Sequence, residues 1–342
     1  MFNDIFLKTC LREETERTPI WLMRQAGRYM SEYQAIRSKH SFLGMCKTPE
    51  LAAEITMQPL KAFGFDAAIL FSDILVPVEA MGVDLEFVEG VGPVLNTKIS
   101  EKEDVDSLKI PDPSSDVPFV MDAIKLLRKN LNVPLIGFSG APFTLASYIL
   151  EGGGSKNYVN SKSIMYGKPA VWDALMTKLS ITISEYLNAQ IDAGAQAVQV
   201  FDSWVGSLAP GDYEKYVKPY TKKIFDSLKG DVPSIHFGTG TTNLLEHMRD
   251  AGGDVIGADW RINLDDAWER IGFDRGIQGN LDPVVLFGPK VEIESRVRDI
   301  IERAGNRPGH IFNLGHGILP TTPVENVRFL VETVKKVSTQ MK

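Results

Sequence analysis

The sequence predicts an α/β fold, a single (β/α)8 or TIM barrel, because short apolar runs alternate with segments of helical periodicity along its 342 residues. Eight of these runs have the length of strands, and a chain of this size is long enough for one such barrel. Several runs are too apolar to alternate, which is typical of parallel strands buried on both faces. A doubly wound open sheet is the alternative, because spacing along the chain does not show whether the sheet closes.

The individual elements follow from the same patterns. Strands are expected at 20–23, 67–71, 135–138, 197–201, 234–237, 255–258, 276–279 and 311–314. Helices are expected at 49–63, 117–130, 169–193, 212–228, 243–251, 265–271, 291–304 and 324–337. The first of these helices begins with Thr48 as a candidate N-cap, followed by Pro49 at the first helical position. Residues 82–99 alternate like a β-hairpin around 90–92 and are expected as an insertion after the second strand.

Composition limits the classes of function. No repeat or shift in composition divides the chain, so we expect one catalytic domain over residues 1–342. A net charge of -7 without a basic run argues against a nucleic-acid partner. The apolar stretches are well short of the roughly 20 residues that cross a bilayer, so no membrane partner is expected. Cys10 and Cys46 are too few for a disulfide framework, and no signal-peptide pattern is present, so a cytoplasmic protein is expected.

A cluster of arginines follows the first apolar run. This run ends at Arg24, and Arg28 and Arg37 come shortly after it. Because an unpaired charge beside apolar surroundings is costly, such arginines need partners. A ligand with several carboxylates or phosphates would supply them and would be bound by charge-assisted hydrogen bonds. Since the chain is negatively charged overall, the attraction has to come from a local cationic patch in a cleft.

The ends of the other expected strands carry further polar residues, as the catalytic end of a barrel does. Asp73 has apolar residues on both sides, so its carboxylate requires either a structural ion pair with one of the arginines or a chemical role. His316 lies between two glycines, which let a backbone approach a ligand closely. Strand-end residues such as Asp202, Asp259 and Asp282 are explained equally well as turn or cap residues.

A second dense segment covers residues 137–155 and contains three consecutive glycines. It lacks the GxxxxGK[ST] spacing of a phosphate-binding loop, so Gly152 is better explained as the end of a helix. Tyr148 lies in that short helical stretch and would face the strand ends. The chain has no HExxH, CxxC or His/Cys cluster, so no metal site is expected, and His236 is expected to be a core histidine.

Five segments carry a resemblance to a known family. Pro-Ile-Trp-Leu-Met-Arg-Gln-Ala-Gly-Arg-Tyr at 19–29 and Gly-Phe-Ser-Gly-Ala-Pro-Phe-Thr-Leu-Ala-Ser-Tyr-Ile-Leu-Glu-Gly-Gly at 137–153 resemble the two signature segments of the uroporphyrinogen decarboxylases. The segments 71–75, 201–204 and 313–317 resemble the same family, and the match extends over essentially the whole chain.

The resemblance implies a (β/α)8 barrel that acts as a homodimer and uses neither a metal nor an organic cofactor. The family removes CO2 from the four acetate side chains of uroporphyrinogen III and leaves coproporphyrinogen III, a step in the synthesis of haem, chlorophyll and other tetrapyrroles. The resemblance implies that Asp73 faces the pyrrole N–H groups and that the arginines bind the substrate carboxylates. The candidate catalytic residues are Asp73, Arg24 and Arg28. The implied substrate-binding residues are Arg24, Gln25, Ala26, Gly27, Arg28, Arg37, Asp73, Tyr148, Ser203 and His316.

These residue types suit that chemistry. An acetate carboxyl group leaves readily only if its electrons can move into a protonated, cationic pyrrole ring. A buried carboxylate near the pyrrole N–H groups stabilises this cation, which forms only along the reaction path. The proton donor stays open, because an arginine is a poor acid with a pKa of about 12.5 or more, and Tyr148, His316 and bound water are the alternatives.

Two other functions are alternatives. A corrinoid-related methyltransferase on the same barrel would bind zinc through a His-x-Cys element, but here Gly238 stands where the thiolate would be. A non-catalytic tetrapyrrole-binding protein would explain the arginines and would leave Asp73 without a role.

Overall fold

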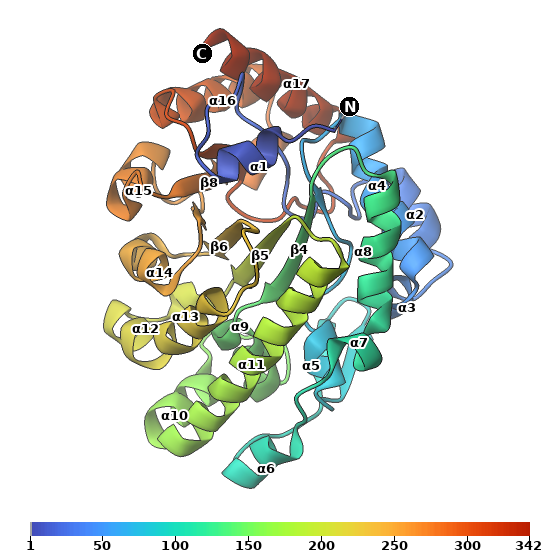
Figure 1. The fold of residues 1–342 in the computed structure, drawn as a ribbon, viewed down its shortest axis with the longest axis vertical. Helices are drawn as coiled ribbons and strands as arrows, with labels where there is room; N and C mark the ends of the chain where they lie inside the picture. Colours follow the sequence, from blue (N-terminus) through green and yellow to red (C-terminus); the bar gives the residue numbers. More distant parts are fainter. Residues whose placement is uncertain (1) are drawn as a thin grey trace.

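The computed structural model describes residues 2–342, and its central feature is a curved sheet of parallel strands with helices around it (Figure 1). Seven strands follow one another in the order β1-β4-β5-β6-β7-β8-β9, and every neighbouring pair is parallel. They are β1 (Ala68–Ile69), β4 (Leu135–Gly140), β5 (Ala197–Asp202), β6 (Ser234–Gly238), β7 (Val255–Gly257), β8 (Gly276–Leu281) and β9 (His310–Leu314). Each coincides with a strand expected from the sequence.

The first apolar run takes the eighth position and joins the two edges of this sheet. Ile20 forms a parallel bridge with Phe312 of β9, and the amide of Phe312 donates to the carbonyl of Pro19 at 2.9 Å. On the other side, the amide of Asp66, just before β1, donates to the carbonyl of Ile20 at 2.9 Å. The predicted (β/α)8 barrel is thereby confirmed, although the expected strand at 20–23 is reduced to a single bridge.

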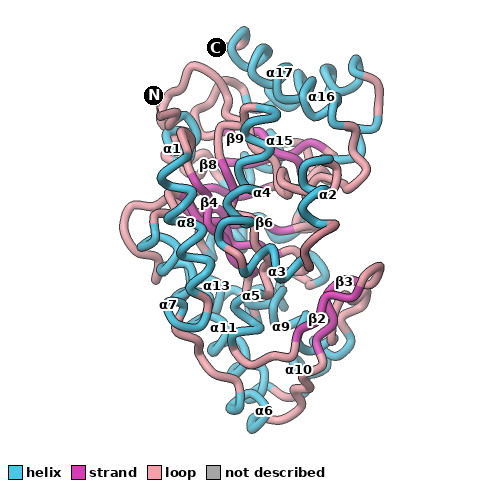
Figure 2. The backbone as a smooth tube through the Cα atoms, turned by 90° about the vertical axis from the view of Figure 1, so that its right-hand side faces the viewer, coloured by secondary structure: helices cyan, strands magenta, loops and turns pink. Residues whose placement is uncertain are grey.

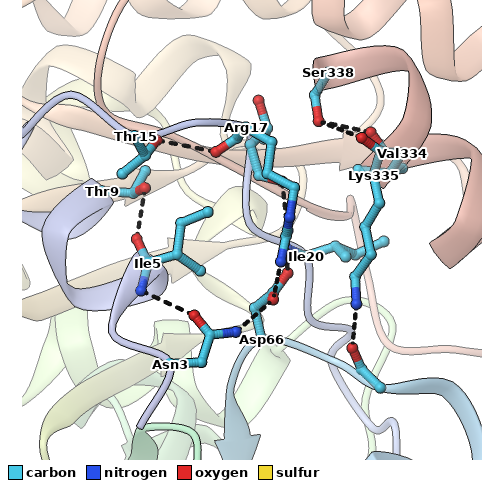
Figure 3. Close-up of polar contacts among 12 residues, drawn as sticks. Asn3, Ile5, Thr9, Thr15, Arg17, Ile20, Asp66, Val334, Lys335 and Ser338 are labelled. Atoms are coloured by element: carbon cyan, nitrogen blue, oxygen red, sulfur yellow. Dashed lines mark hydrogen bonds and ion pairs between the residues drawn. The ribbon is translucent and has the colours of Figure 1, made fainter. Parts of the chain in front are cut away.

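A buried ion pair holds this junction together (Figure 3). Both guanidinium nitrogens of Arg17 donate to the carboxylate of Asp66, at 2.8 and 2.6 Å. The same carboxylate accepts from the amide of Ile20 at 2.9 Å and from the side-chain amide of Asn3 at 3.0 Å. Burial disfavours the charge on Arg17, but the hydrogen bonds and charge of Asp66 outweigh this and raise the pKa of Arg17. Asp66, just before β1, thus binds the first run through Ile20 and the preceding chain through Arg17 and Asn3.

Helices cover the outside of the sheet. They are α1 (Ile5–Cys10), α2 (Ser31–Arg37), α3 (Phe42–Lys47), α4 (Pro49–Phe63), α5 (Val76–Ala80), α6 (Lys102–Ser107), α7 (Pro113–Asp116), α8 (Pro118–Asn130), α9 (Pro142–Glu151), α10 (Val159–Gly167), α11 (Pro169–Ala193), α12 (Pro210–Tyr216), α13 (Lys218–Asp226), α14 (Leu245–Ala251), α15 (Leu264–Ile271), α16 (Lys290–Ala304) and α17 (Val324–Gln340), with 3-10 turns η1 (Val205–Ser207), η2 (Thr242–Leu244) and η3 (Pro283–Phe287). The helix expected at 212–228 is instead two helices that meet at Val217. Pro219 explains the break, because it lacks an N–H and its ring clashes with the carbonyl four residues earlier.

The expected hairpin insertion is also present, between β1 and β4. Strands β2 (Leu85–Val88) and β3 (Gly92–Leu95) pair antiparallel, and Figure 2 shows them outside the barrel sheet. The hairpin contacts the end of α9, since the amide of Leu95 donates to the carbonyl of Gly152 at 3.1 Å. Gly152 has φ 74° and ends α9, which confirms its interpretation as a helix terminator. A β-carbon on Gly153 would lie 2.9 Å from the carbonyl oxygen of Pro93, so the glycines allow this close approach.

Within residues 2–342, no helix has both the length and the apolar character needed to cross a bilayer.

We expect Asp66→Asn to lower the free energy of unfolding by about 3–5 kcal/mol, the usual cost of removing one partner of a buried ion pair. The side chain of Asp66 is 1% exposed and that of Arg17 is 15% exposed, so water solvates the guanidinium left behind only poorly. Urea denaturation followed by circular dichroism measures the change. Asp106→Asn is the control, because Asp106 and its partner Lys102 are each 56% exposed. Equal effects of the two substitutions would contradict the importance of the junction.

Candidate active site

The loop after the bridge at Ile20 brings Arg24 to the carboxyl ends of the strands. The amide of Met23 donates to Oδ1 of Asn313 at 3.0 Å, and the carbonyl of Met23 accepts from the amide of Ile318 at 2.9 Å. These two bonds join the residue before Arg24 to both ends of the loop that contains His316. The first and last strands of the sequence therefore contribute neighbouring side chains to one site.

Arg24 has an unusual backbone conformation. Its φ of 63° lies in the left-handed region, which is uncommon for a residue other than glycine and is often found at functional positions. Its side chain crosses Gly317, where a β-carbon would lie 2.5 Å from Cδ of Arg24. Across residues 2–342, Arg24 has no ion-pair partner within 4.0 Å. The guanidinium is thus held over the loop after β9 and is free to bind a ligand anion.

The side chain of Gln25 supports this turn. Its Oε1 accepts from the amide of Leu22 at 3.1 Å, and its Nε2 donates to the carbonyl of Ala67 at 3.1 Å. The carbonyl of Gln25 accepts from the hydroxyl of Tyr29 at 2.7 Å. The side-chain amide and the carbonyl of Gln25 therefore form their hydrogen bonds within the protein. The amides of Ala26 and Gly27 have no backbone acceptor in the described part of the chain, so they are among the donors that this segment offers to a ligand.

Asp73 follows β1 and lies near Arg24. Its Oδ1 accepts from the amide of Leu75 at 2.9 Å. Burial raises the pKa of Asp73 above its usual value, and the Leu75 amide and the positive charge of Arg24 act in the opposite direction. Within residues 2–342, no arginine lies within ion-pair distance of this carboxylate, so the structural salt bridge weighed from the sequence is not formed. The carboxylate is partly buried, makes one hydrogen bond within residues 2–342 and lies close to a cation.

Tyr148 and His316 complete the group around Asp73 and Arg24. Burial, and next the charge of Asp73, raise the pKa of Tyr148 to about 12. Burial, and next the charge of Arg24, lower the pKa of His316. Both side chains are therefore neutral at pH 7 and can donate or accept hydrogen bonds. Four of the predicted residues, from four different segments, act on one another electrostatically.

Three predicted residues lie around this group. Ser203 directly follows β5 and is partly buried. Arg28 is exposed, and Arg37 at the end of α2 donates to the carbonyl of His40 at 2.9 Å. Burial raises the pKa of Tyr33, and the charges of Arg37 and Arg28 oppose that rise, so both guanidiniums lie near Tyr33. The Tyr33 ring contacts that of Phe71, two residues before Asp73, with 5.8 Å between the centroids. Arg28 and Arg37 thus form an outer group.

Sequence reasoning missed the aromatic residues of the site. Trp204 stacks against Tyr148 with 3.8 Å between ring centroids, and Trp260 contacts His316 edge-on at 6.4 Å. Phe201 contacts Phe138 at 5.6 Å and Phe237 at 6.1 Å across neighbouring strands. The three phenylalanines belong to apolar runs in which every residue looks like core, so only the three-dimensional arrangement identifies them as an apolar floor at the strand ends.

The other strand-end residues have structural roles. Oδ1 of Asp282 accepts from the amide of Val284 at 2.9 Å and caps η3. Asp259 accepts from the amide of Arg261 at 2.9 Å and pairs with its guanidinium at 2.6 Å. The turn and cap interpretation is therefore confirmed for both.

The structure contains no site arranged for a metal within residues 2–342, where no group of three or more His, Cys, Asp and Glu side chains comes together. His236 is fully buried against the helix layer, with Nδ1 3.2 Å from the carbonyl of Met248 and its ring 5.1 Å from that of Phe225. Its interpretation as a core histidine is confirmed.

Two surface hollows lie elsewhere. One of about 660 Å³ is bordered by Lys218, Arg249 and Arg275, where cations and carboxylates alternate. The other, of about 730 Å³, lies between α2 and α4. Neither includes a predicted site residue. The candidate site is the group of charged and aromatic residues at the carboxyl ends of the strands, where barrel enzymes carry their chemistry.

Comparisons with known proteins identify the family of the chain. The family described as "Uroporphyrinogen decarboxylase (URO-D)" matches residues 1–337. The chain is 59% identical over 339 residues to the uroporphyrinogen decarboxylase of Carboxydothermus hydrogenoformans, covering 98% of this chain and 97% of that one. It is 55% identical over 339 residues to the uroporphyrinogen decarboxylase of Geobacter metallireducens, covering 98% and 99% of the two chains.

Solved structures share the fold. A methyltransferase from Methanosarcina mazei superimposes with a TM-score of 0.82 and 22% identity, covering 98% of each chain. A putative vitamin-B12 independent methionine synthase from Listeria monocytogenes gives a TM-score of 0.56 and 12% identity, covering 94% of this chain and 96% of that one. At these identities the likeness extends to the barrel architecture alone.

The charges in the site predict a titration experiment. Asp73 should titrate above the usual range of aspartate, and His316 below that of histidine. Arg24→Ala removes a positive charge near both, which disfavours the carboxylate and favours the imidazolium, so both pKa values should rise. NMR of labelled carboxyl and imidazole groups measures them. Arg37→Ala is the control, and a fall of either pKa in Arg24→Ala would contradict the arrangement.

Proposed function

Because the chain belongs to the uroporphyrinogen decarboxylase family, we propose that its strand-end site binds uroporphyrinogen III and removes CO2 from the four acetate side chains, giving coproporphyrinogen III. The chain is a decarboxylase of porphyrin biosynthesis, a carboxy-lyase. The observation that supports this reaction most directly is the pair of opposite charges, Asp73 and Arg24, which lie close together without forming an ion pair.

Asp73 suits the stabilisation of a pyrrole cation. In the protein alone its carboxylate is destabilised by burial, which is the first cause of its raised pKa. A pyrrole ring that gains a proton becomes a cation and compensates this partly desolvated negative charge. The compensation is largest when the cation is fully developed, so it lowers the barrier more than it strengthens substrate binding.

The arginines suit the carboxylates of the same molecule. Each charge-assisted hydrogen bond contributes about 1.5–3 kcal/mol, so several bonds together hold an octa-carboxylate against the negative net charge of the chain. The floor of Phe138, Phe201 and Phe237 offers an apolar surface to the macrocycle. Tyr148 and His316, both neutral at pH 7, serve as hydrogen-bonding groups, and their shifted pKa values make each a poor proton donor. We therefore favour bound water as the proton source.

The alternative functions have less support. Gly238 stands where a zinc-binding methyltransferase would need a thiolate, and a β-carbon at that position would lie 2.6 Å from Cγ2 of Thr241. A pure tetrapyrrole carrier has no use for a partly buried Asp73 without an ion-pair partner. An anaerobic assay of uroporphyrinogen III that follows each carboxyl group lost tests the proposal, and binding without turnover would favour the carrier.

We also propose that the chain works as one catalytic domain, as a homodimer and in the cytoplasm, on the pattern of the family. Sedimentation velocity tests the dimer, and fractionation of cells tests the location.

Asp73→Asn should retain most of the affinity for uroporphyrinogen and reduce kcat by about 100-fold or more, because it keeps the shape of the side chain and removes the charge. Equilibrium binding and single-turnover rates measure the two quantities separately. Loss of binding together with an unchanged single-turnover rate would contradict the charge-stabilisation role.

Gly317→Ala should raise KM about tenfold with little change in stability, because the added methyl group displaces the Arg24 side chain and weakens a charge-assisted bond. In an Arg24→Ala background the same substitution should have no further effect. Gly211→Ala is the control, because a β-carbon there has no neighbour within 4 Å. Additive effects of Gly317→Ala and Arg24→Ala would contradict this explanation.

A further inference from the structure

Asp202, the last residue of β5, is 0% exposed, and its side chain is directed away from the barrel interior. Gln199, on the opposite face of this strand, accepts a hydrogen bond from Gln278 of β8 at 3.1 Å inside the barrel. Because side chains alternate along a strand, Asp202 faces the helix layer. There its Oδ1 accepts from the hydroxyl of Thr144 at 3.0 Å.

Thr144 connects this carboxylate with two aromatic rings of the active site. Its hydroxyl donates to Asp202 and also accepts from the backbone amide of Trp204 at 3.3 Å. Thr144 is on α9, one turn before Tyr148, so the two side chains lie on the same face of that helix. Tyr148 in turn stacks on Trp204 with 3.8 Å between centroids and an angle of 31°. The hydroxyl thus fixes both the strand end that carries Trp204 and the helix that carries Tyr148.

The arrangement is costly for the fold. Oδ2 of Asp202 lies 4.0 Å from Nε2 of His236, and neither atom has a hydrogen-bond partner among residues 2–342. The hydroxyl of Tyr213 is likewise buried and without a partner there. An incompletely bonded carboxylate in a sealed layer costs free energy, and an apolar side chain would avoid this cost. Stability alone therefore does not explain Asp202.

We propose that Asp202 is a positioning residue that acts through Thr144 to hold Tyr148 and Trp204 in the orientation the active site requires. This role rests on the proposed function, because Tyr148 belongs to the site assigned above. Asp202 itself touches no substrate. Its effect on catalysis comes from preorganising a side chain that does.

The test uses Thr144→Val, which keeps the shape of the side chain and removes both hydrogen bonds. We expect kcat/KM for uroporphyrinogen to fall about tenfold, the consequence of losing about one such bond in the positioned state. Thr144→Ser restores the hydroxyl and should recover most of the loss. Thr182→Val is the matched control, because the hydroxyl of Thr182 is buried on α11 and has no partner in the described chain.

Near-ultraviolet circular dichroism supplies a readout that needs no substrate. Thr144→Val should reduce the signal of the Tyr148–Trp204 stack, identified as the part that disappears in Trp204→Phe. In a Tyr148→Ala background, Thr144→Val should have a much smaller further effect on kcat/KM. Absence of turnover in the unmodified protein would overturn the proposed function, whereas the dichroism would still test the positioning. A lower melting temperature with unchanged dichroism and unchanged kcat/KM would show a merely structural role and overturn the inference.

Discussion

Closure of the barrel at Asp66 is the constraint on which the rest of the structure depends. The first apolar run has a single bridge to β9, and the Asp66 carboxylate adds bonds to Arg17 and to the amide of Ile20. Arg24 follows Ile20 by one short loop, and its position next to the loop of His316 depends on this attachment. The bond of Ile20 to Asp66 on one side, and the bonds of Met23 to Asn313 and Ile318 on the other, therefore position Arg24.

The site separates its charges instead of neutralising them. The charge of Arg24 acts on Asp73, Tyr148 and His316 without forming an ion pair with any of them. Burial raises the pKa of Asp73 and Tyr148 and lowers that of His316, so it favours the neutral form of each group. The free energy that an internal ion pair would release is thus kept for the ligand. This is preorganisation in the electrostatic sense, and a fold that fastens Arg24 by its backbone can sustain it.

The strand positions, the hairpin and most helices could be predicted from the sequence, because apolar periodicity and turn residues are local signals. The first strand was overestimated, since its hydrogen bonds depend on Asp66 and Asn313, which are distant in the sequence. Asp73, Asp202 and Asp259 all follow apolar runs and look alike in the sequence. The structure separates them by what each side chain bonds: Leu75, Thr144 or Arg261. The phenylalanine floor could not be predicted, because a strand buried on both faces does not reveal which side chains point inward.

The left-handed backbone at Arg24 has a consequence for selection. Glycine adopts this conformation without the steric cost that a side chain incurs, so Arg24→Gly would relieve the backbone while removing the guanidinium. A library of variants sorted only for thermal stability would enrich Arg24→Gly and lose the guanidinium of the site. The same library sorted for porphyrin synthesis would retain the arginine at the expense of heat tolerance. At this residue, selection for thermal stability favours glycine and selection for activity favours arginine.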